Sequence, residues 1–107
     1  MLGLRLMALA VATSVTLACA SSSRGLVPAG TPEPDKYLFD RGTQALTDKK
    51  WIQARDFFKQ VVETYTQSPY RPDAKIGLGD TYFGEETAES LVLAISEYRE
   101  FLSFYPT

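Results

Sequence analysis

The chain contains no histidine and only one cysteine among its 107 residues. Without histidine there is no imidazole to act as a general base or as a zinc ligand. A single cysteine cannot form an internal disulfide. Basic and acidic residues are nearly balanced, 11 against 13, so we expect no strongly positive surface for nucleic acid. These absences argue against a hydrolase, a metalloenzyme and a nucleic-acid-binding protein.

The first residues have the composition of an export signal, MLGLRLMALAVATSVTL. Arg5 precedes a mostly apolar run over residues 6–16. This run is shorter than the roughly 20 residues that a helix needs to cross a bilayer. A basic start, a short apolar middle and small residues at the end are typical of a signal peptide. The alternative is a buried N-terminal helix, which the lack of a polar face disfavours. We therefore predict a signal peptide over residues 1–18.

The only cysteine, Cys19, lies between this apolar run and a serine cluster. The sequence Leu17-Ala18-Cys19 is similar to the lipobox of bacterial lipoproteins, in which the cysteine sulfur receives a diacylglyceryl group. Thr16 stands where lipoboxes usually carry leucine, and ordinary secretory cleavage after Ala20 is the alternative. We predict lipidation of Cys19, because this sole cysteine stands at the end of the apolar run and is followed by ASSS. The two acyl chains of a diacylglyceryl group would provide a stable membrane anchor. By the sorting rules of such lipoproteins, Ala20 implies the outer membrane.

Residues 19–35 are predicted to form a flexible tether. The segment is rich in serine, glycine and proline, contains Pro28, Pro32 and Pro34, and offers little to bury. Residues 20–35 would span about 22 Å as a random coil, which keeps the domain close to the lipid surface. A segment that binds a partner is the alternative.

Beyond the tether, apolar residues recur at helical spacing and no long stretch alternates with a period of two. We predict four helices. The first covers about residues 35–49 with Asp35 as its N-cap, and the second follows Asp48 as its N-cap. The third has Pro72 in its first turn and ends near Gly84. The fourth follows a loop with the sequence EETAES, in which Thr87 is the predicted cap.

The second and fourth predicted helices can be aligned with each other. Ala54 and Phe58 then correspond to Ala94 and Tyr98, 40 residues later. A repeat of this length with two helices per unit is typical of tetratricopeptide repeats, and LGDTY (78–82) matches part of their pattern. We predict an all-α, right-handed solenoid of two helical hairpins, about residues 36–69 and 70–107. An unrelated four-helix bundle is the alternative.

The aligned positions suggest how the hairpins pack. Small residues at corresponding positions would let paired helices approach closely, and large aromatic residues would fill the space between successive pairs. The predicted repeat-packing residues are Gly42, Ala54, Phe58, Gly79, Tyr82, Ala94 and Tyr98.

A lipobox, a short tether and tandem repeats together resemble the BamD family of outer-membrane protein assembly lipoproteins. The stretches that carry the resemblance are YLFDRGTQALTDKKWIQARDFFKQVVETYTQSPYRPDAKIGLGDTYF and LAISEYREFLSFYPT. The resemblance implies a lipid anchor at the periplasmic face of the outer membrane of a Gram-negative-type bacterium. It also implies protein partners, namely β-barrel precursors and other subunits of the assembly machinery, and no nucleic acid.

Family members carry about five repeats, whereas this sequence stops after the second. We therefore expect a fragment of a longer protein, with a complete two-repeat lipoprotein as the alternative. Isolated repeats leave part of an apolar face uncovered, since each unit buries its face on the next. The residues expected on this face are Tyr98, Phe101, Leu102 and Tyr105.

The predicted function is a noncatalytic binding module. A groove on the first helix of each pair would suit an extended peptide, and ordinary packing between repeats is the alternative reading of the same positions. The groove candidates are Phe39, Thr43, Leu46, Ile76, Asp80 and Phe83. A docking scaffold in another envelope or secretion system is the alternative function. No enzymatic activity and no cofactor are expected, because the carboxylates fall mainly on presumed exposed faces and caps.

Overall fold

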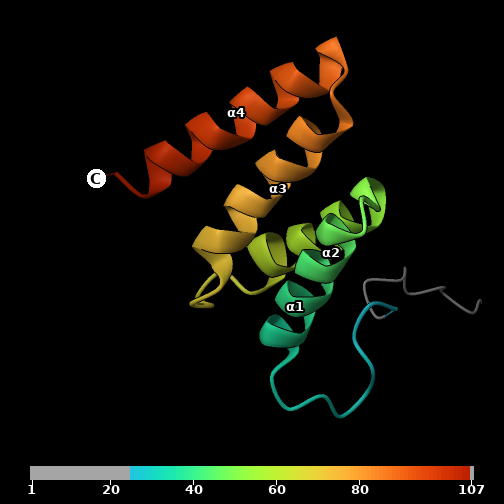
Figure 1. Cartoon of the computed structure of the whole chain (residues 1–107). Coiled ribbons are helices and arrows are strands. Elements are labelled where there is room, and N and C mark those ends of the chain that lie inside the picture. The colour runs from blue at the N-terminus through green and yellow to red at the C-terminus, as the bar shows by residue number, and fades with distance from the viewer. Residues whose placement is uncertain (1–24, 107) are drawn as a thin grey trace, which may run out of the picture.

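The computed structural model describes residues 25–106 and contains four helices. They are α1 (Pro34–Thr47), α2 (Trp51–Thr64), α3 (Arg71–Glu85) and α4 (Ala88–Phe104) (Figure 1). Residues 25–106 contain no strand, and the all-α prediction is confirmed. In the same stretch, no helix has the length and hydrophobicity required of a bilayer-spanning segment. The predicted signal peptide and Cys19 lie outside the described residues.

The helices form two consecutive hairpins, α1–α2 and α3–α4. α3 packs against α2 and also contacts α1, whereas α4 packs only against α3 among the four helices (Figure 1). This stacking of one helical hairpin on the next is the arrangement expected of tetratricopeptide-like repeats. α3 is therefore the element that joins the two hairpins.

The core lies around α2. This helix buries Ala54, Phe57, Phe58, Val61 and Val62. α1 contributes one face to the same core, and α3 adds further small and apolar side chains. The contributing residues are Leu38, Gly42, Ala45, Ala74 and Leu78. Spacing of three and four residues places such side chains on one face of each helix.

Two of the predicted N-caps are wrong. Asp35 lies in the first turn of α1, because Pro34 already begins the helix. Its carboxylate accepts a hydrogen bond from the Ser68 hydroxyl at 2.6 Å. Asp48 is the C-cap of α1 and not the N-cap of α2, because the chain reverses at Lys49 with a φ of 57°.

The two predictions for the second hairpin's helix starts are confirmed. Pro72 lies in the first turn of α3. The Thr87 hydroxyl accepts a hydrogen bond from the Ser90 backbone N–H at 3.0 Å, and Ser90 Oγ accepts one from the Thr87 N–H at 2.9 Å. The loop is shorter than the predicted EETAES, because α3 continues to Glu85 and α4 begins at Ala88. Glu86 turns the chain with a φ of 59°.

Residues 25–33 precede α1 and are the described part of the segment predicted as a tether. Leu26 and Val27 are partly buried and pack against the hydrophobic core. A turn follows, in which the Thr31 hydroxyl donates a hydrogen bond to the Pro28 carbonyl at 2.7 Å. The segment offers more to bury than its composition suggested, because these two apolar side chains find a partly uncovered apolar surface on the first hairpin.

Candidate functional site

The first hairpin meets α3 around the ring of Phe58. A Cβ added at Gly42 of α1 would lie 2.7 Å from Phe58 Cε1, and one added at Gly77 of α3 would lie 2.7 Å from Cε2. The ring thus occupies the space that two glycines leave open on opposite sides. Gly42 and Phe58 were predicted from the repeat, whereas Gly77 was not. The apolar spacing of α3 could have revealed it, since Gly77 lies between Ala74 and Leu78.

The second hairpin uses a similar contact. The Tyr98 ring of α4 lies directly against Gly79 of α3, with no room for a Cβ there. The Tyr98 hydroxyl donates a hydrogen bond to the Asp80 carboxylate at 2.6 Å. Burial, followed by this bond to Asp80, raises the pKa of the Tyr98 phenol. Ala94 is buried in α4, as the corresponding Ala54 is in α2.

A polar cluster beside Tyr82 joins α2 to the end of α3. The Arg55 guanidinium lies 4.4 Å from the centre of the Tyr82 ring and forms an ion pair with Glu85. Trp51 lies directly against Gly84 on the same side. Tyr82 therefore belongs to the interface between the hairpins. Sequence comparison of the repeats missed Arg55 and Trp51, because α4 carries aliphatic residues at the corresponding positions.

Two of the three groove candidates on α1 lie in the packing between hairpins. Phe39 stacks on Tyr70 with ring centres 5.3 Å apart, and its ring is 6.0 Å from that of Phe58. Leu46 packs against the core. Thr43 is exposed, and its hydroxyl donates to the Phe39 carbonyl at 2.9 Å. Of the three candidates on α1, exposed Thr43 and half-buried Phe39 are therefore the ones that a ligand could contact.

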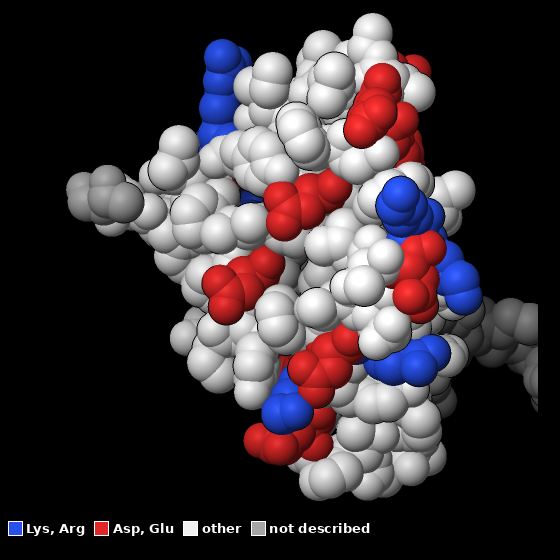
Figure 2. All heavy atoms as spheres, viewed as in Figure 1, with Lys and Arg blue, Asp and Glu red and all other residues white. Residues whose placement is uncertain are grey.

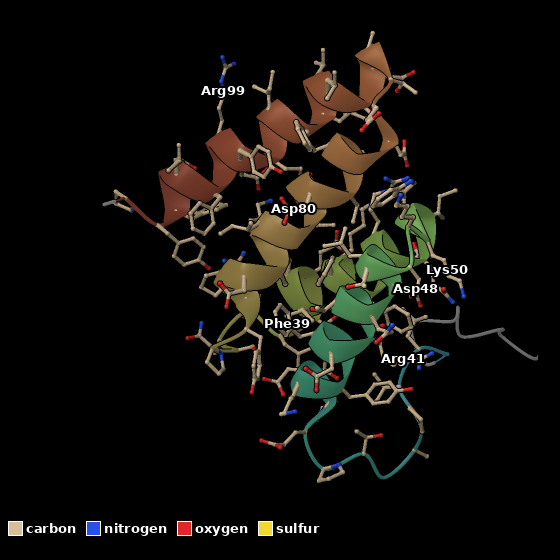
Figure 3. The ribbon with its side chains drawn as sticks, viewed as in Figure 1. Phe39, Arg41, Asp48, Lys50, Asp80 and Arg99 are labelled. Carbon is tan, nitrogen blue, oxygen red and sulfur yellow. The ribbon has the colours of Figure 1, made fainter. Side chains whose placement is uncertain are left out.

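The three groove candidates on α3 do not share one environment. Asp80 was expected beside the α1 residues, but its carboxylate bonds to Tyr98 of α4 instead (Figure 3). The expectation failed because the phenol oxygen extends past Gly79 to the next position of α3. Ile76 is half-buried, whereas Phe83 exposes 60% of its surface. Figure 2 shows acidic side chains distributed over the face that α1 and α3 present to the viewer.

A depression of about 590 Å³ lies at the start of α2. Its apolar lining comes from Leu26 of the linker and from Trp51, Ile52 and Phe57 of α2. Lys50, Gln53, Asp56 and Glu85 supply polar groups at its margin. The sequence did not predict this depression, because it depends on the packing of the linker against the helices.

A buried cation lies between α3 and α4. Lys75 is 5% exposed, and its ammonium lies 2.8 Å from Glu100 Oε1 and 3.1 Å from Glu97 Oε2. Burial alone would lower the pKa of Lys75, but Glu100 and Glu97 together keep this pKa above its usual value. This arrangement is that of a structural ion pair. Within residues 25–106, no three His, Cys, Asp or Glu side chains are grouped to hold a metal ion.

Comparison with known proteins gives one result. No curated protein and no solved structure matches the chain. The family model described as "YfiO: Outer membrane lipoprotein" matches residues 32–107, which include all four helices and both hairpin contacts. This match extends over more than half of the chain. The protein therefore belongs to the YfiO, or BamD, family of outer membrane lipoproteins.

Proposed function

We propose that this protein is a lipid-anchored, noncatalytic subunit of the machinery that assembles β-barrel proteins in the outer membrane. It would lie at the periplasmic face and bind unfolded barrel segments or partner subunits. The observation that carries the proposal is the family match over residues 32–107. The stacked hairpins support it, because such repeats present extended surfaces for protein binding.

The proposed binding surface follows α1 and α3 from Phe39 past Thr43 to Phe83. Aromatic groups at both ends with polar groups between them suit an extended peptide whose apolar side chains alternate. Phe83 is the main contact, because its ring is largely exposed in the unliganded protein. The acidic side chains on the face shown in Figure 2 would disfavour a negatively charged segment.

The proposed anchor is a diacylglyceryl group on Cys19. Mass spectrometry of detergent-extracted protein would measure it directly, and an unmodified thiol would contradict it. A Cys19→Ala variant should leave the membrane fraction if the acyl chains hold the protein there.

Substitution of Phe83 tests the binding surface. Phe83→Ser should weaken the binding of peptides from barrel strands, measured by fluorescence anisotropy with a labelled peptide. The matched control is Phe104→Ser, because Phe104 is 53% exposed but lies on α4. Equal loss in both variants, or no loss in Phe83→Ser, would contradict this surface.

Co-purification distinguishes the two functional alternatives. An affinity-tagged protein should bring down subunits of the barrel-assembly machinery from solubilised envelopes. Recovery of a different envelope or secretion complex would instead support the general docking scaffold.

A further inference from the structure

The α1–α2 turn and the linker beside it form a surface that we call the turn patch: Leu26, Lys49, Lys50, Trp51 and Ile52. Four of these residues line the same depression, and Lys49 lies next to them in the turn. We propose that the turn patch contacts the anionic phospholipid surface of the membrane to which the protein is anchored. This inference depends on the lipid anchor in the proposed function.

The length of chain before Leu26 limits where the turn patch can lie. Leu26 follows Cys19 by seven residues, which span about 25 Å at most. Leu26 is itself packed against the core. An acyl group on Cys19 would therefore hold this end of the first hairpin within about 25 Å of the lipid. No such constraint acts directly on α4, which contacts neither α1 nor α2.

The side chains of the turn patch suit the boundary between lipid and water. Ile52 exposes 71% of its surface, and Trp51 beside it is half-buried. Lys49 and Lys50 are exposed, and neither forms an ion pair with another described residue. Exposed aliphatic and indole groups insert at the headgroup level, while lysines reach the phosphates.

The surrounding charges leave a small positive excess. Arg41 adds a third basic side chain on the side of the hairpin where Lys50 and the linker lie (Figure 3). Glu85 is paired with Arg55, whereas Asp56 in the lining of the depression and Asp48 near Lys50 are opposing charges (Figure 3). With an excess this small, attraction to anionic headgroups must act together with the apolar contact of Ile52 and Trp51.

Trp51 provides the measurement, because it is the only tryptophan in the chain. The acylated protein would be reconstituted in lipid vesicles of phosphatidylethanolamine and phosphatidylglycerol, with and without bromine on the phosphatidylglycerol chains. Brominated chains quench a nearby indole. We expect clear quenching in the wild-type protein, and loss of most of it in a Lys49→Glu, Lys50→Glu, Ile52→Ser variant.

A control variant changes the same kinds of residue elsewhere. Lys59→Glu with Ile95→Ser alters an exposed lysine of α2 and an exposed isoleucine of α4, and should keep the wild-type quenching. Far-UV circular dichroism would verify that both variants fold. A second reporter, Trp51→Phe with Phe104→Trp, places the indole on α4 and should show no quenching.

The possible results distinguish failure of the membrane contact from failure of the lipid anchor. An acylated protein whose Trp51 is not quenched, or is quenched equally in the patch and control variants, overturns the membrane contact and leaves the anchor in place. An unmodified Cys19 thiol in the mass spectrum overturns both. Quenching that depends on Lys49, Lys50 and Ile52 supports the membrane contact.

Discussion

The helices α2 and α4 occupy corresponding places in the two hairpins, yet they are buried to very different extents. α2 lies between α1 and α3 and buries five apolar side chains, whereas α4 packs on α3 alone and buries only Ser90 and Ala94. α4 is nevertheless the more apolar helix in composition. Burial here is therefore determined by how many neighbours a helix has and not by its own hydrophobicity.

The comparison is clearest at corresponding positions 40 residues apart. Val62 of α2 is 8% exposed and Leu102 of α4 is 56% exposed, although both are aliphatic. Arg55 packs on Tyr82 of α3, whereas Ile95 at the corresponding position of α4 is half exposed. The side of α2 that receives α3 corresponds to the side of α4 that remains open. Contiguous exposed apolar surface of this kind marks an interaction surface.

The largest effect is expected for Phe58→Ala. The ring is 1% exposed and fills the space between Gly42 and Gly77, so its loss leaves a cavity between the hairpins. The free energy of unfolding should fall by about 3–5 kcal/mol. Urea denaturation followed by circular dichroism would measure it. The corresponding Tyr98→Ala should cost clearly less, because Tyr98 is covered on one side only, and an equal loss would contradict the comparison.

Replacing the buried cation should cost less than removing the Phe58 ring. In Lys75→Met, Glu97 and Glu100 lose the ammonium between them, and the free energy of unfolding should fall by about 1–3 kcal/mol. The matched control is Lys36→Met, whose exposed pair with Asp40 should leave the urea midpoint unchanged. Similar behaviour of the two variants would mean that burial of Lys75 has no energetic consequence.

Adding one methyl group should separate crowded from open glycine positions. In Gly42→Ala the new Cβ meets the Phe58 ring, and the ring cannot move away because Gly77 of α3 lies against its other side. We therefore expect the free energy of unfolding to fall by about 1–2 kcal/mol. Gly25→Ala is the control, because nothing lies within 4 Å of its Cβ position. Thermal melts of both variants would measure the difference, and an equal melting temperature for Gly42→Ala and Gly25→Ala would contradict the close contact between Gly42 and Phe58.

Alkaline pH should weaken the second hairpin selectively. The folded-state pKa values of Tyr98 and Lys75 both lie above the usual values of 10.0 and 10.5 for these groups. Their contributions to stability are therefore complete below about pH 10 and are lost as the pH rises through the folded-state values. Tyr98→Phe removes the bond to Asp80 and should reduce the decline in urea midpoint above pH 10. A decline identical to that of the wild type would exclude Tyr98 as its source.

The smallest effect is expected for Leu102→Ser. This side chain is already half exposed, so the free energy of unfolding should change by less than about 0.5 kcal/mol. Val62→Ser, at the corresponding buried position, should destabilise the protein strongly. Chemical denaturation of the two variants side by side tests this directly, and comparable losses would mean that the open side of α4 is covered in solution.

Sequence reasoning predicted the parts of the fold that depend on spacing within one helix. The period of three to four residues located the helices, and the repeat identified Phe58 and Gly42, which meet in the structure. Residues whose placement depends on a second element were predicted less well. Asp80 accepts a hydrogen bond from the Tyr98 hydroxyl of α4, and the spacing of α3 alone could not show this contact. Leu26 packs against the core of the first hairpin, which its own segment could not show either.

The predicted caps failed for a related reason. Aspartate favours N-caps, but its neighbours determine where a helix begins. Pro34 starts α1 before Asp35, and the left-handed conformation of Lys49 delays α2 beyond Asp48. Thr87 was predicted correctly because its partner Ser90 lies only three residues away. Local partners are visible in a sequence, whereas distant ones are not.

The two-residue connection between α3 and α4 also bears on how the chain folds. Glu86 and Thr87 alone separate the helices, so the contacts beside this turn join residues that are near in sequence. Short loops close fast and at little entropic cost, and the reciprocal Thr87–Ser90 bonds favour the first turn of α4. Pairing of α3 with α4 therefore starts at the turn and proceeds toward Arg71 and Tyr105, which form the contact farthest from it in sequence.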